Sequence, residues 1–112
     1  MAEEKNLENR LKKWLELMGI YPLGCPIQKM TVPPNGYYEK RWGGGKFTKS
    51  GLPDMHICVK GKSIEVELKA VNGKPSDLQL HNLKQINESG GCGLLIYPQD
   101  LDKLKSVILE EL

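Results

Sequence analysis

The stretch GLPDMHICVKGKSIEVELKA, residues 51–70, decides the fold, because two alternating runs flank the dipeptide Lys60-Gly61. Successive side chains of a strand point to opposite faces, so the runs 54–59 and 63–70 each have one apolar and one polar face. A two-residue turn at Lys60-Gly61 pairs Val59 with Lys62 and makes the two apolar faces coincide. The stretch is therefore predicted to form a β-hairpin.

The polar face of this hairpin collects ionisable groups. The same register puts His56 opposite Glu65 and Asp54 opposite Glu67. Like charges opposite each other destabilise a sheet. A divalent cation between them would offset the repulsion, since carboxylate oxygens are ligands that Mg²⁺ or Mn²⁺ prefers. The alternative is an exposed polar face on which Lys69 neutralises a carboxylate.

The pattern of the whole chain predicts one mixed α/β domain, residues 1–112, in the order α-β-β-β-α-β-α. Apolar spacing predicts a helix over 6–18, capped by Asn6 and ended by Gly19. The other expected helices are 76–89, capped by Ser76, and 100–112. The expected strands are 25–32, 54–59, 63–70 and 93–98, with a long loop over 33–51.

Composition excludes several classes of protein. Three separated cysteines without a Cys-x-x-Cys pair argue against a disulfide framework or a zinc knuckle and favour a reducing compartment. The N-terminus has no apolar signal core, and no run is long enough to span a bilayer, so we expect a cytoplasmic protein without a membrane partner. The segment GGGKFTKS, residues 43–50, fails the phosphate-binding-loop spacing, which argues against a nucleotide triphosphatase, and we expect no nucleotide cofactor.

Two polar residues occupy helical positions that favour burial. Gln79 lies within the apolar arc of helix 76–89 and needs a buried partner, or else it closes a capping box with Ser76. Glu8 shares a helix edge with Leu11 and Leu15 and could face the interior. The helix position alone favours the alternative, a frayed first-turn residue whose charge suits the helix dipole, and Glu4 lies on the same edge.

Local charge, rather than the net charge of +2, points to nucleic acid. Residues 29–50 contain five basic side chains against the single acid Glu39, together with four of the seven aromatic residues. Such interleaving suits phosphate contacts and base stacking, although a solvated loop whose aromatics plug the core has the same composition. The residues expected to contact DNA are Lys40, Arg41, Trp42, Lys46, Lys49 and Ser50.

The string Ser50-Gly-Leu-Pro-Asp54, the run Glu67-Leu-Lys69-Ala70, a Gly-Lys-Pro-Ser turn and Gln79 early in the next helix together resemble the virus-type replication-repair nuclease (VRR-NUC) family. This family belongs to the PD-(D/E)XK nuclease superfamily, and the resemblance is to its short, stand-alone, phage-like form. It covers residues 50–97 well and the first helix loosely, and it leaves the long loop unaligned.

The resemblance implies a nuclease-like core and a metal-dependent endonuclease. Asp54 and Glu67 would hold Mg²⁺ or Mn²⁺ together with the Leu68 carbonyl, and Glu8 would complete or support the site. Lys69 would orient the attacking water, and Gln79 would position Lys69 or the water. Stand-alone members resemble Holliday-junction resolvases, which act as homodimers on branched DNA.

Three functions fit these residues. The favoured one is a structure-selective DNA endonuclease, a junction resolvase acting as a homodimer. The second is a nickase or flap-type nuclease that works as a monomer. The third is a non-catalytic module that binds junctions without metal; the complete set of Asp54, Glu67 and Lys69 disfavours it.

Overall fold

A computed structural model describes residues 2–41 and 51–112 and has the predicted mixed α/β class. Its helices are α1 (Ala2–Leu17), α2 (Asp77–Glu88) and α3 (Leu101–Glu111), and two short 3₁₀ turns are η1 (Ile27–Lys29) and η2 (Pro98–Asp100). Its strands are β1 (Ile20–Pro22), β2 (Gly36–Lys40), β3 (Met55–Val59), β4 (Lys62–Leu68) and β5 (Cys92–Ile96).

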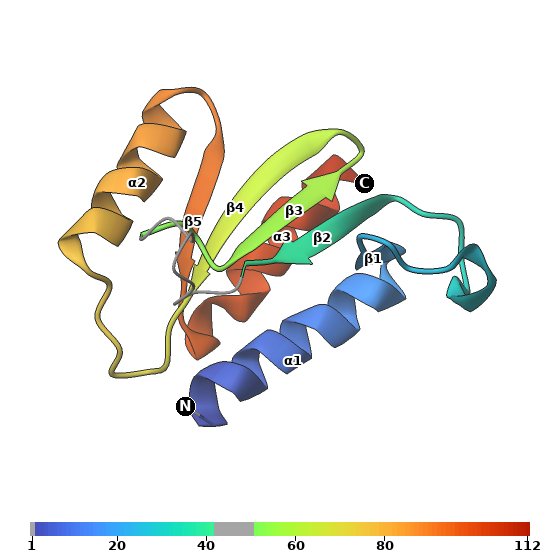
Figure 1. Ribbon diagram of the computed structural model, residues 1–112, viewed down its shortest axis with the longest axis horizontal. Helices are drawn as coiled ribbons and strands as arrows, with labels where there is room; N and C mark the ends of the chain where they lie inside the picture. The colour runs from blue at the N-terminus through green and yellow to red at the C-terminus, as the bar shows by residue number, and fades with distance from the viewer. Residues whose placement is uncertain (1, 42–50) are drawn as a thin grey trace.

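The strands form one mixed sheet in the order β1-β2-β3-β4-β5 (Figure 1). The central strands β2, β3 and β4 run antiparallel, while β1 and β5 join parallel to their neighbours. A parallel connection needs a long crossover, which α2 supplies between β4 and β5. The hairpin register pairs Val59 with Lys62 and His56 with Glu65, so the predicted pairing is confirmed.

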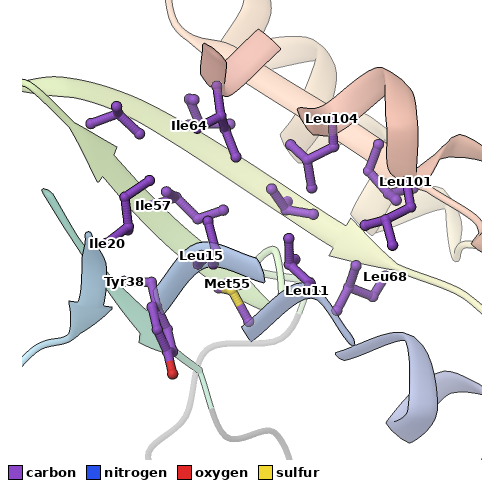
Figure 2. Packing of buried hydrophobic residues seen from close by; sticks show 14 of the residues in the cluster. Leu11, Leu15, Ile20, Tyr38, Met55, Ile57, Ile64, Leu68, Leu101 and Leu104 are labelled. Atoms are coloured by element: carbon purple, nitrogen blue, oxygen red, sulfur yellow. The ribbon is translucent and has the colours of Figure 1, made fainter. Parts of the chain in front are cut away.

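The apolar face of the hairpin makes the core. Met55, Ile57 and Val59 are fully buried and alternate with partly exposed neighbours. Leucines of α1 and α3 cover this face, as Figure 2 shows for Leu11 and Leu104. Helix α2 packs on the other face, the one that carries the polar residues, where the backbone of Gly93 meets the side chains of α2.

The strand predicted over 25–32 is wrong. The chain makes the turn η1 there, closed by the Lys29 N–H donating to the Pro26 carbonyl at 2.9 Å, and Ile27 is 80% exposed. Proline has no N–H to give to a sheet ladder, so apolar residues that follow Pro26 need not form a strand. The strand that joins the sheet here is β1, which comes directly after α1.

The long loop predicted over 33–51 contains a strand, β2, so the sheet has one strand more than the order α-β-β-β-α-β-α. Tyr37 and Tyr38 have high strand propensity, but the surrounding prolines and glycines favoured the prediction of a loop. Gly36 permits the pairing, because a Cβ at this position would lie 1.9 Å from the Cys58 carbonyl oxygen.

The predicted helix ends are confirmed more often than the predicted starts. Helix α1 begins at Ala2, so Asn6 lies inside it and the predicted cap is wrong. Gly19 follows the helix with φ 81°, as expected of a terminating glycine. Ser76 caps α2 as predicted. Of the helices in the described ranges, none is both long and apolar enough to cross a membrane.

Candidate metal centre

Two carboxylates meet at the open end of the hairpin. Asp54 directly precedes β3 and Glu67 lies near the end of β4, one step beyond the last pair, Met55 with Val66. The Leu68 N–H donates to Asp54 Oδ2 at 2.8 Å, which turns Asp54 toward β4. The predicted juxtaposition of Asp54 and Glu67 is therefore confirmed.

Glu67 is an acid within the protein interior, only 1% exposed. Its Oε2 accepts from Gln79 Nε2 at 3.1 Å and lies 3.5 Å from Lys69 Nζ. Its other oxygen, Oε1, is buried and meets no hydrogen-bond donor in the described part of the chain. A buried acceptor without a donor is costly, so this oxygen calls for a proton or a cation.

The electrostatics of Glu67 follow from this environment. Burial, the charge of Asp54 and a hydrogen bond with Asp54 raise the pKa of Glu67 to about 8, against the opposing effect of Lys69. Two ionised carboxylates only accept hydrogen bonds, so Asp54 and Glu67 can bond to each other when one of the two carboxyls carries a proton. In metal-free protein the pair is therefore expected to share a proton near neutral pH, and a divalent cation would replace it.

Lys69 and the Leu68 carbonyl stand beside this pair. The Lys69 N–H donates to the Ile96 carbonyl at 3.0 Å, which keeps the end of β4 tied to β5. The N–H and C=O of one extended residue project to the same side, so the Leu68 carbonyl is directed, like its amide, toward Asp54. The residues implied as ligands, Asp54, Glu67 and Leu68, thus come together.

Gln79 satisfies both interpretations of its position. Its side-chain oxygen accepts from the Ser76 N–H at 2.8 Å, while the Gln79 N–H donates to the Ser76 hydroxyl at 3.1 Å. This capping box leaves the amide nitrogen pointing at Glu67. Gln79 therefore fixes the buried carboxylate directly, and its contact in the site is with Glu67.

Glu8 faces inward, one of the two alternatives that its helix position left open, and the structure gives it partners other than the two carboxylates. It is 3% exposed and forms ion pairs with Lys5 at 3.0 Å, with Lys12 at 2.8 Å and with Lys40. Over residues 2–41 and 51–112, no three His, Cys, Asp or Glu side chains gather as a ready-made metal site. Glu8 is therefore not a third carboxylate beside Asp54 and Glu67.

The three lysines lower the pKa of Glu8 and so favour its ionised form. Burial would raise its pKa, but hydrogen bonds from Lys12, Lys40 and Lys5 outweigh burial and lower the pKa of Glu8 to about 2. Glu8→Gln is expected to lower the free energy of unfolding by ~2 kcal/mol near neutral pH, with solvent screening at the lysines limiting the loss.

Because the pKa of Glu8 in the folded protein lies below its ordinary value of 4.5, this stabilisation is present above that value and is lost as pH falls toward about 2. Urea titrations of parent and Glu8→Gln near pH 7, 5 and 3 measure it, with the exposed Glu110→Gln as the matched control. The gap between parent and Glu8→Gln should narrow as the buffer is acidified. A gap that stays constant would contradict ionic stabilisation by Glu8.

The predicted DNA-contacting residues divide into two groups. Trp42, Lys46, Lys49 and Ser50 lie outside the described residues. Lys40 pairs with Glu8, and Arg41 donates to Glu65 from its two terminal guanidinium nitrogens, Nη1 and Nη2. The backbone N–H of Arg41 also donates to the backbone carbonyl of Asp54 at 2.7 Å. This bond ties the chain at the end of β2 to the carboxylate pair.

A polar network beyond the carboxylates was not predicted in full. His56 Nε2 lies 2.7 Å from the Ser63 hydroxyl and 3.7 Å from Glu65 Oε2, and Glu65 also holds Arg41. The hairpin register predicted the approach of His56 to Glu65, whereas Arg41 reaches Glu65 from 24 positions away along the chain. One cavity of about 480 Å³ opens beside this network, lined by Arg41, Glu65, Asn82, Gln85, Leu52 and Ile86 among others.

No protein-family model matches this chain, and no curated protein matches it significantly. The resemblance to the VRR-NUC family therefore rests on the residues quoted for it within 50–97. Of those, Asp54 directly before β3, Glu67 in β4, Lys69 directly after β4 and Gln79 in α2 converge on one site. The chemistry of that site is the basis on which a function can be argued.

Proposed function

We propose that this chain is a metal-dependent, structure-selective endonuclease that hydrolyses phosphodiester bonds of branched DNA, with the Holliday junction as its substrate. The observation that carries the proposal is the buried Glu67 carboxylate beside Asp54 and Lys69, one oxygen of which has no donor among the residues that the structure describes. Buried like charges are costly unless they are neutralised, and such perturbed groups concentrate at functional sites.

The residues present fit a Mg²⁺ or Mn²⁺ ion. Asp54 and Glu67 would hold it with the Leu68 carbonyl, and Mg²⁺ in proteins is commonly bound by one or two carboxylates together with water and substrate phosphate. When bound, the ion supplies positive charge that polarises the phosphoryl group and lowers the pKa of water. The site therefore needs no third carboxylate, and Glu8 is free for another role.

The protein's own residues prepare the reaction around that ion. Lys69 Nζ, 3.5 Å from Glu67, places a positive charge where it can orient the attacking water and stabilise charge that develops on the phosphate. Gln79 holds Glu67 in place and so restricts the rotation of a ligand. Both act by positioning and electrostatics.

The homodimer and an intracellular location belong to the same proposal. A four-way junction has two equivalent strands to cut, and two-fold symmetry of the enzyme matches that requirement. Among the described strands β5 lies at an edge of the sheet, and on the C-terminal segment Leu109 and Leu112 are 52% and 44% exposed. These are the surfaces that a second copy would cover.

The proposal is tested by incubating the protein with labelled four-way junction, fork and linear duplex, each with Mg²⁺, Mn²⁺ or EDTA. Paired cuts in the junction with either metal and none in EDTA are expected, with the linear duplex left intact. Junction binding without cutting in any metal would instead indicate a non-catalytic module. Sedimentation completes the test, since a monomer at micromolar concentration that nicks forks would favour the flap-type nuclease.

A further inference from the structure

A second polar cluster, separate from the metal centre, surrounds Glu8. Three ammonium groups contact this one carboxylate: Lys5 and Lys12 come from α1 and Lys40 comes from β2. The formal charges of these four side chains sum to +2. We call these four residues the lysine cluster.

The cluster is held in place. The side chains of Lys12 and Lys40 are 25% and 20% exposed, so their aliphatic stems are packed against the protein while their charged ends approach Glu8. Fixing a long side chain costs conformational entropy, and here folding has already met that cost. An ammonium has three N–H donors, so contact with one carboxylate oxygen does not exhaust it.

The lysine cluster lies at the same end of the sheet as the two carboxylates. In the sheet, Lys40 of β2 lies opposite Met55 of β3, the residue directly after Asp54. At the start of α1, Glu3 Oε1 accepts from the Val71 N–H at 2.6 Å, two residues after Lys69. Alternation along β3 puts Met55 and Asp54 on opposite faces, so the cluster flanks the metal centre from the α1 side.

Basic character continues along α1 away from the metal centre. Lys12 also lines a cavity of about 390 Å³, whose lining contains two further lysines, Lys13 and Lys29, and one acid, Glu16. Positive groups therefore follow one another from the end of β2 along the helix. A polymer with regularly spaced negative charges is the ligand that such an arrangement suits.

We propose that the lysine cluster is a binding site for phosphate groups of the DNA backbone, with Glu8 as the positioning residue that holds its ammonium groups toward the strand. The inference rests on the proposed nuclease function for the identity of the ligand. It gives Glu8 a role in substrate binding in place of metal ligation. Contacts of this kind fix the register of a nucleic acid and carry no sequence information.

Fluorescence anisotropy tests the proposal, with labelled four-way junction and linear duplex in EDTA at several NaCl concentrations. Lys12→Gln and Lys40→Gln are each expected to weaken binding roughly tenfold near physiological salt. Each should also flatten the slope of log K against log [salt] by ~0.9, the loss of one phosphate contact. The effect should be similar for both DNA structures, and Lys12→Arg should restore the parental slope.

Lys62→Gln is the matched control, because Lys62 is exposed on β4 at the opposite end of the sheet. It should keep the parental slope, and Mn²⁺ binding should be unchanged in every variant. Parental slopes in folded Lys12→Gln and Lys40→Gln, from a parent that binds and cuts DNA, would overturn the phosphate site and leave the nuclease standing. A parent that binds no DNA at any salt concentration would overturn both.

Discussion

Asp54→Asn and Glu67→Gln are each expected to slow Mg²⁺-dependent cleavage of a four-way junction by ~1,000-fold or more. Each change removes one of the two carboxylates that would hold the ion. A bound metal contributes several kcal/mol to the stabilisation of the transition state, and each ~1.4 kcal/mol is tenfold in rate. Single-turnover cleavage of labelled junction with excess enzyme measures the effect on the chemical step.

Both variants should keep the fold, so a loss of cleavage activity can be assigned to the site. In Asp54→Asn the amide oxygen still accepts from the Leu68 N–H, and the amide nitrogen can donate to Glu67. This variant should be at least as stable as the parent in EDTA. Asp102→Asn, the same change at an exposed position of α3, is the control and should cut normally. Parental cleavage rates in Asp54→Asn would remove the basis for metal catalysis.

The metal-free protein is expected to lose several kcal/mol of unfolding free energy as pH rises from about 4.5 to about 8. The pKa of Glu67 in the folded protein lies above its ordinary value, so the folded state binds more protons than the unfolded state within this window. Stability is therefore highest below the window and falls as the shared proton leaves. Each unit of pKa difference is worth about 1.4 kcal/mol.

Denaturant titrations in EDTA across this pH range measure the effect, and Glu67→Gln supplies the baseline for all other groups. The difference between parent and Glu67→Gln should change with pH in the stated direction. Saturating Mn²⁺ should reduce the loss at high pH, since binding to the folded state stabilises it. If the free energy of unfolding of the parent changed with pH as it does in Glu67→Gln, the shared proton between Asp54 and Glu67 would be contradicted.

The hairpin and the approach of its two acids could be predicted because both depend on local rules. Side-chain alternation and a two-residue turn are enough to pair His56 with Glu65 and to place Asp54 against Glu67. The capping box of Ser76 and Gln79 spans three residues and is equally local. What the local pattern left open was whether Gln79 caps the helix or contacts the site, and it does both.

The features of the fold and the site that could not be predicted depend on contacts between distant segments. Lys40 reaches Glu8 across 32 positions and Arg41 reaches Glu65 across 24, and no spacing rule connects them. The helix edge of Glu8 left an inward position and a solvated first-turn position both open, and its lysine partner on β2 could be identified only once the sheet was known. The segment predicted as a strand over 25–32 forms a 3₁₀ turn instead, and its apolar side chains Ile27 and Val32 stay 80% and 41% exposed.

The central claim, that Asp54 and Glu67 together bind a divalent cation, is tested most directly by crystals equilibrated with Mn²⁺ and measured for anomalous scattering. An anomalous peak is predicted between the Asp54 carboxylate and Glu67 Oε1, and Asp54→Asn crystals treated in the same way should lack it. A map from saturated crystals with no peak at this position, and with Glu67 Oε1 still without a partner, would contradict the claim.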